Sequence, residues 1–129
     1  MSDSSAEALR SRILPVALYA RPAEVVAPAI IGDILVHESS EGLCAGRIVE
    51  AEAYLACGDP GCHAASGKTR RNAPMWEDPG TAYVYVIHTH NLLNAVTGAR
   101  GFPEAVLIRA LEPVAGLGLM RQRRGFDRE

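Results

Sequence analysis

Alternating apolar and polar positions run through residues 47–54 and predict a strand in the middle of a sheet. Successive side chains of a strand point to opposite faces. One face would then carry Ile48, Glu50, Glu52 and Tyr54, and the other Val49, Ala51 and Ala53. Because the second face is small and apolar, we expect it to lie on the core, which leaves carboxylates beside an aromatic ring on the first. A half-exposed strand whose acids simply face solvent is the alternative.

The remaining pattern predicts further strands, a few helices and one long loop. A helix is expected from Pro22, which suits a first helical position, to Gly32, with Pro28 bending or shortening it. Strands are expected over residues 33–38, 43–54, 81–87, 92–97 and 104–111, an extended piece over 15–20, a hairpin tip over 88–91 and a basic helix over 113–124. The stretch 55–80 is rich in Gly, Pro and polar residues, and a loop this long is more often functional than idle.

This order of elements predicts one α+β domain over residues 1–129. We expect a mostly antiparallel, curved sheet with a protruding β-hairpin and flanking helices, and a flexible segment over residues 1–13. No apolar run approaches the roughly 20 residues that span a bilayer, and the first residues lack the features of a signal peptide. The three cysteines then fit reduced thiols. We therefore expect a cytoplasmic protein with no membrane partner.

The charge of the chain gives a mixed indication about nucleic acid. A net charge of −2 weighs against such a partner, because nucleic-acid-binding domains are usually basic. Two local basic patches could still serve: Lys68, Arg70 and Arg71 in the long loop, and Arg121, Arg123, Arg124 and Arg128 near the last residue.

One set of side chains suits a flat heteroaromatic ligand. It consists of Glu52, Tyr54, His63, Tyr83 or Tyr85, Asn94 and Arg109. Aromatic rings supply stacking area, while the amide and the imidazole can form hydrogen bonds with the edges of a base.

Several motifs in register carry a resemblance to a known family. They are Arg47-Ile-Val-Glu-Ala-Glu-Ala-Tyr-Leu55, Asp59-Pro60-x-x-His63, Gly67-x-Thr69-x-Arg71-Asn72, Met75, Pro79-Gly80-x-x-Tyr83-Val-Tyr85, Asn94 and Ala105-Val-Leu-Ile-Arg109-Ala-Leu-Glu-Pro113. The chain resembles, from about Arg21 to Arg124, the 3-methyladenine (alkyladenine) DNA glycosylase family typified by the mammalian enzyme.

The resemblance implies hydrolysis of the N-glycosidic bond of alkylated or deaminated purines flipped out of duplex DNA. The expected lesions are 3-methyladenine, 7-methylguanine, hypoxanthine and ethenoadenine. Glu52 matches the general base that activates water, and Arg109 a pocket arginine near that water. The base-binding pocket is matched by Tyr54, His63, Tyr85 and Asn94, of which the first three sandwich the base and the last crowds the amino group of normal guanine.

The same resemblance implies that the protein needs no metal and no cofactor. We expect a monomer that binds damaged duplex DNA and that, in a bacterium, is associated with the nucleoid. Residues matched to DNA contacts are His88, Thr69, Arg71 and Lys68. A lyase step would need an amine nucleophile, and Lys68 is the only lysine. We therefore expect a monofunctional glycosylase.

Three departures from the family pattern keep alternatives open. The hairpin tip is one residue shorter and has His88 where the family inserts a tyrosine into the gap left by the flipped base. Arg70 replaces a usual proline, and an end at Glu129 implies that the C-terminal part of the family domain is absent. An inactive or weakly active DNA-binding paralogue is one alternative. A metal-binding domain is another, using Cys57, Cys62, His63, His88 and His90.

Overall fold

The computed structural model describes residues 3–55 and 67–125. Its helices are α1 (Asp3–Arg10), α2 (Val16–Tyr19), α3 (Ala23–Ala29), α4 (Leu117–Arg124) and the 3-10 helix η1 (Ala73–Trp76). Its strands are β1 (Ile34–Ser39), β2 (Gly42–Tyr54), β3 (Ala82–Ile87), β4 (His90–Thr97) and β5 (Glu104–Ala115). The predicted α+β class is confirmed. No helix within the described ranges is long and apolar enough to cross a bilayer.

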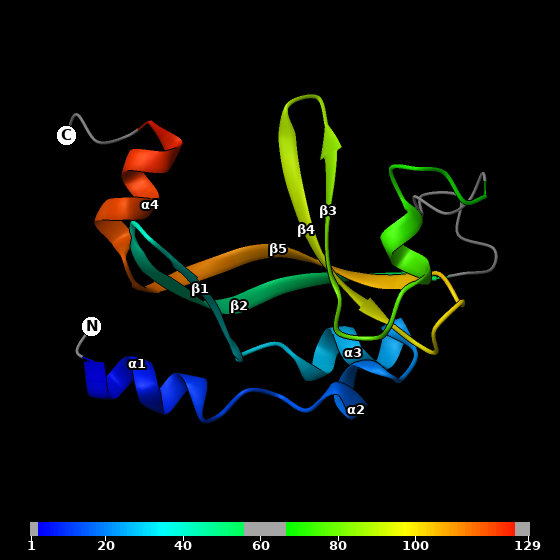
Figure 1. Ribbon diagram of the computed structural model, residues 1–129, viewed down its shortest axis with the longest axis horizontal. Helices are drawn as coiled ribbons and strands as arrows, with labels where there is room; N and C mark the ends of the chain where they lie inside the picture. Colours follow the sequence, from blue (N-terminus) through cyan, green and yellow to red (C-terminus); the bar gives the residue numbers. More distant parts are fainter. Residues whose placement is uncertain (1–2, 56–66, 126–129) are drawn as a thin grey trace.

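The strands form one sheet in the order β1-β2-β5-β4-β3, and every neighbouring pair is antiparallel. The sheet is curved, and the hairpin of β3 and β4 stands out from it, as predicted (Figure 1). The helices α1, α2 and α3 follow one another along one side, and α4 lies at the far end of β2 and β5 (Figure 1). β1 and β3 are the edge strands.

A local irregularity in the β2–β5 pairing decides which side chains of β2 face the helices. Ile48 pairs with Leu111 and Ala51 with Ile108, but the register shifts between these two pairs and leaves Val49 and Arg109 without a residue opposite. An unpaired residue of this kind inverts the alternation of faces that follows it. Ile48, only 5% exposed, therefore lies on the same side as Ala51, whereas Val49 is 46% exposed. The expected faces of Ile48 and Val49 were wrong for this reason.

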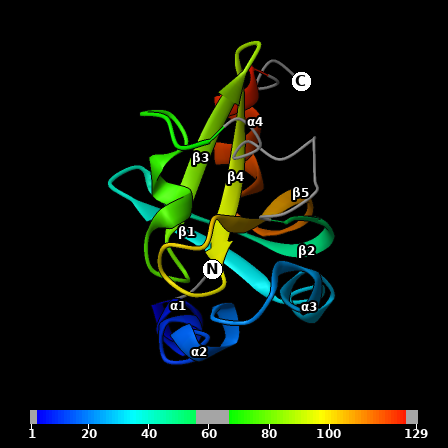
Figure 2. The ribbon, with the colours of Figure 1, turned by 90° about the vertical axis from the view of Figure 1, so that its right-hand side faces the viewer.

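Each face of the sheet carries its own cluster of buried residues. The helix-side core consists of Ala23, Val26, Ala27, Ile30, Ile48 and Val106. The η1-side core consists of Met75, Tyr83, Val96 and Ala105, with Tyr54, Trp76 and Tyr85 packed against it. Figure 2 shows α3 below the strands β2 and β5, and η1 beside the hairpin. The aromatic candidates of the site therefore belong to the η1 side.

The start of α3 is tied to the sheet by a buried carboxylate. Pro22 precedes the helix, and the backbone N–H of Ala23 donates to Oε1 of Glu104 over 3.0 Å. A carboxylate at a helix N-terminus satisfies an otherwise unpaired donor and interacts favourably with the helix dipole. Pro28 is accommodated because the helix is short and ends at Ala29.

Three other segments differ from the sequence prediction. The expected extended piece over 15–20 contains the short helix α2 instead. The strand β5 continues through Pro113, where the register with Gly46 of β2 also shifts, and α4 begins only at Leu117. Proline is tolerated in a strand at such irregular positions. Residues 3–10, placed by the sequence in a flexible segment, form α1, and Arg10 pairs with Glu38 of β1 at 2.6 Å.

Candidate active site

The carboxylate of Glu52 is held from two sides. The phenolic O–H of Tyr54 donates to its Oε2 over 2.7 Å, and Nη1 of Arg109 lies 3.3 Å from its Oε1. The side chains of Glu52 and Arg109 are 45% and 51% exposed, so this ion pair adds little to stability. Its effect is geometric: both carboxylate oxygens are oriented while the group stays accessible to water.

Arg109 lies beside Glu52 because the two side chains share one face of the β2–β5 pair. Glu52 pairs with Leu107, and Arg109 follows two residues later on the same face of β5. Arg109 is also one of the residues of β5 that have none opposite them on β2. β-Bulges are common next to active sites, where they redirect a side chain. The sequence suggested both residues but not the ion pair between them.

Asn94 occupies the same row of the sheet as Glu52. The row crosses four strands through Tyr83, Asn94, Leu107 and Glu52. Asn94 is 1% exposed, and its Nδ2 donates to the carbonyl of Leu92 over 3.1 Å and to that of Tyr83 over 3.4 Å. Its Oδ1 has no hydrogen-bond partner among the residues described. A buried acceptor left unpaired costs about 1–3 kcal/mol, so the orientation of this amide is set by the two hydrogen bonds of Nδ2 at the expense of Oδ1.

Tyr85 lies two residues after Tyr83 on β3 and is in contact with an arginine. The rings of Tyr83 and Tyr85 meet edge to face, with centroids 6.0 Å apart and planes at 67°. The guanidinium carbon of Arg71 lies 4.5 Å from the centroid of the Tyr85 ring, and Nη2 donates to the carbonyl oxygen of Val86. The arginine expected at the DNA is therefore packed on a ring expected in the pocket.

The loop before η1 is organised by Asn72, which is 2% exposed. Its Oδ1 accepts from the N–H of Thr69 over 2.6 Å, its own N–H donates to Oγ1 of Thr69 over 3.3 Å, and its Nδ2 donates to the carbonyl of Gly67 over 3.0 Å. Lys68 lies with Nζ 5.7 Å from the centroid of a Trp76 ring. The site prediction did not include Asn72, although an asparagine in a Gly- and Thr-containing loop is a common turn former.

The tip of the β3–β4 hairpin consists of His88 and Thr89. Ile87 pairs with His90, so the turn has two residues, and both have positive φ, 48° for His88 and 71° for Thr89. Such turns normally contain Asn and Gly, because a β-branched residue at positive φ is strained. His88 and Arg109 line a common open cleft of about 380 Å³. The other residues that line it are Ile87, His90, Asn91, Leu92, Leu107 and Ile108.

The family model of methylpurine-DNA glycosylases matches residues 17–129. The chain belongs to this family. A protein of Methanoculleus marisnigri is 53% identical over 115 residues, 88% of this chain and 59% of that protein. Proteins of Chlorobium phaeobacteroides and Bacillus subtilis are 48% and 45% identical over 112 residues, covering 85% and 86% of this chain and 56% and 57% of their own length. All three carry the provisional name 3-methyladenine DNA glycosylase.

Family membership confirms the resemblance found in the sequence. The chain spans little more than half the length of these methylpurine-DNA glycosylase relatives. Of the residues expected in the base-binding pocket, the structure places Tyr54, Tyr85 and Asn94 on the η1-side face, which also carries Glu52. His63 lies outside the described residues.

The metal alternative rests mostly on residues that the structure does not describe. Within residues 3–55 and 67–125, no group of three or more His, Cys, Asp or Glu side chains is placed to hold a metal ion. Cys57, Cys62 and His63 of the alternative ligand set lie outside those ranges. Cys44 is a buried thiol near the start of β2.

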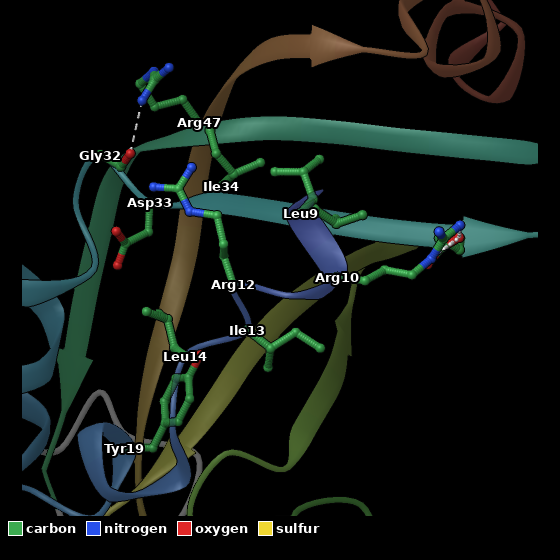
Figure 3. Close-up of a pocket in the computed structure, with 12 residues that line it drawn as sticks. Leu9, Arg10, Arg12, Ile13, Leu14, Tyr19, Gly32, Asp33, Ile34 and Arg47 are labelled. Carbon is green, nitrogen blue, oxygen red and sulfur yellow. Dashed lines mark hydrogen bonds and ion pairs between the residues drawn. The ribbon is translucent and has the colours of Figure 1, made fainter. Parts of the chain in front are cut away.

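A second cavity, of about 720 Å³, lies apart from Glu52 between the segment after α1 and the edge strand β1 (Figure 3). Leu14 and Arg12 reach it from the first segment, and Ile34 lines it from the strand. It shares no lining residue with the hairpin cleft. Burial and the nearby Asp33 carboxylate raise the pKa of Tyr19, another of its lining residues.

Proposed function

We propose that the chain acts as a DNA glycosylase that hydrolyses the N-glycosidic bond of alkylated or deaminated purines flipped out of duplex DNA. The observation that supports this most is the Glu52 carboxylate, accessible yet oriented by Tyr54 and Arg109, in a member of the methylpurine-DNA glycosylase family. The candidate lesions are 3-methyladenine, 7-methylguanine, hypoxanthine and ethenoadenine.

Glu52 would act as the general base. Its carboxylate takes a proton from a water molecule, whose oxygen bonds to the anomeric carbon of the sugar. The bond from that carbon to the purine nitrogen breaks, and the purine leaves with the bonding electron pair. A positioned general base typically contributes a hundredfold to ten-thousandfold in rate. Arg109 and Tyr54 orient the carboxylate, and no step requires a metal or cofactor.

The pocket would bind the purine by stacking and by its polar edges. Tyr54 and Tyr85 offer rings on the same face of the sheet as Glu52. His63 would be the third residue that stacks on the base. Stacking on an aromatic side chain is worth about 1–3 kcal/mol per base. Asn94 lies buried in the row of Glu52, where its amide would exclude the exocyclic amino group of normal guanine.

Contact with the duplex is proposed at the hairpin tip and the adjacent loop. His88, held at the end of the hairpin, would enter the gap left by the flipped base. Lys68 and Thr69 would contact the DNA backbone through new contacts, because each already interacts with another part of the chain. Arg71 would contact the DNA backbone while its guanidinium stays on the ring of Tyr85. The active species would be a monomer without lyase activity, located in the cytoplasm.

A second candidate is a DNA-binding paralogue with weak or no base release. The observation in its favour is the two-residue tip, in which His88 stands where the family pattern has a larger aromatic residue. A smaller side chain fills the gap in the stack less completely and stabilises the flipped state less.

The deciding experiment compares Glu52→Gln with wild type on duplexes containing hypoxanthine or 3-methyladenine. Wild type should release free base, and Glu52→Gln should bind the same duplex without release. Glu50→Gln is the matched control, because Glu50 is an exposed acid of the same strand. Equal release by wild type and Glu52→Gln would remove Glu52 from the mechanism, and binding without release by wild type would favour the second candidate.

A further inference from the structure

The guanidinium of Arg71 is fixed against the ring of Tyr85 by more than one contact. Its carbon lies 4.5 Å from the ring centroid, within the range of a cation–π interaction. One guanidinium nitrogen also donates to the carbonyl oxygen of Val86, on the edge strand β3. Because an edge strand has backbone groups that its neighbour does not use, this hydrogen bond competes with none in the sheet.

The loop that carries Arg71 is itself held in place. The buried side chain of Asn72 binds the backbone of Thr69 and Gly67, and the carbonyl of Asn72 accepts from the N–H of Met75 over 2.9 Å. Met75 belongs to the η1-side core. The charge of Arg71 therefore stays beside the ring through contacts that reach the core.

A permanent positive charge at this place affects cationic and neutral bases differently. An arginine stays protonated at any pH at which the protein is folded. A base that stacks on Tyr85 is separated from this charge by no more than the tyrosine ring. Alkylation at a ring nitrogen, as in 7-methylguanine, makes a purine cationic, whereas deamination to hypoxanthine leaves it neutral. Two cations at one aromatic ring repel each other, so the arginine opposes only the first kind of lesion.

We propose that Arg71 is a specificity-determining residue that shifts the pocket toward uncharged purine lesions. The inference rests on the proposed function, because it assumes that the flipped base stacks on Tyr85. The arginine acts through its charge on that ring, without touching the atoms that react.

The neighbouring Arg70 provides a matched control. It lies in the same loop, is exposed, and makes no hydrogen bond, ion pair or ring contact in the part of the chain that is described. Changing either arginine to glutamine removes one positive charge from the same loop, and a weaker attraction to DNA affects both duplexes alike, so it cancels in the ratio of their release rates. Arg71→Lys keeps the charge and tests the shape of the side chain.

The experiment uses the full chain and two duplexes that differ only in one base, 7-methylguanine or hypoxanthine. Single-turnover release rates give the ratio of cationic to neutral lesion for each variant. Arg71→Gln should raise this ratio about threefold to tenfold, the size expected for repulsion between two charges on either side of one ring in a partly solvated site. Arg70→Gln and Arg71→Lys should leave it near the wild-type value. Circular dichroism melting curves identify any variant that has lost its fold.

Each outcome has one meaning. An unchanged ratio for Arg71→Gln, or an equal change for both glutamine variants, overturns the role of Arg71 and leaves the proposed function standing. A rise in both rates by the same factor shows that Arg71 merely blocks the ring, which also overturns it. Release of neither base by wild type overturns the proposed function and with it this inference.

Discussion

Tyr54 donates its phenolic hydrogen to the carboxylate of Glu52, two residues earlier on the same strand, over 2.7 Å. The pair is possible because residues i and i+2 of a strand share a face. Tyr54 also packs against the η1-side core, so its ring is fixed while its hydroxyl reaches the accessible acid. One tyrosine thus combines a stacking surface with control of the proposed general base.

The first prediction separates these two roles. Tyr54→Phe keeps the ring but removes the hydrogen bond, and a hydrogen bond to a charged group is worth about 1.5–3 kcal/mol. Because the carboxylate is half exposed, water replaces part of this interaction, and we expect base release to slow by about threefold to thirtyfold. Binding of the damaged duplex should change little. Single-turnover rates and equilibrium binding measure the two effects.

Tyr19→Phe is the control for this experiment, because Tyr19 lines the cavity beside β1 and not the hairpin cleft. Its release rate should equal that of wild type. If Tyr54→Phe were as fast as this control, the hydroxyl would have no part in orienting Glu52.

The second prediction concerns the strained hairpin tip. Thr89 is β-branched and has a φ of 71°, a conformation that glycine adopts without cost. Strain of this kind costs about 1–3 kcal/mol per residue, so Thr89→Gly should raise the melting temperature by several degrees. Since His88 is kept, the rate of base release should not fall.

His88→Gly gives the complementary measurement. It replaces the other tip residue, which has a φ of 48°, and should also stabilise the fold. It also removes the side chain proposed to fill the gap that the flipped base leaves in the base stack. We expect slower release from this variant alone. Equal release by the two glycine variants would show that the tip does not insert into the duplex.

The third prediction follows from the raised pKa of Tyr19. Burial and the charge of Asp33 hold this pKa above its usual value near 10. The neutral phenol therefore contributes stability that is complete below pH 10 and is lost as the pH rises through the higher folded-state value. In an absorbance titration at alkaline pH, Tyr19→Phe should remove one tyrosine that ionises late, and the loss of stability above pH 10 should become less steep.

The residues of the site were easier to predict than the geometry that joins them. Glu52, Tyr54 and Arg109 follow from motifs in the chain, and the strands that carry them follow from the period of apolar positions. The sequence does not show that Val49 and Arg109 lack paired residues, because register depends on how two distant strands meet. For the same reason the contact of Arg71 with Tyr85 could not be predicted, since it joins a loop to an edge strand.

At Val49, the number of residues in β2 matters more for the fold than the identity of the side chain, because the register shifts at this position. Val49 is half exposed, so replacing it should alter little. Inserting one further residue beside it would turn every later residue of the strand to the opposite face, and Glu52 would then point into the helix-side core. An insertion here should therefore be tolerated far less than a substitution, although the side chain of Val49 belongs to neither core cluster.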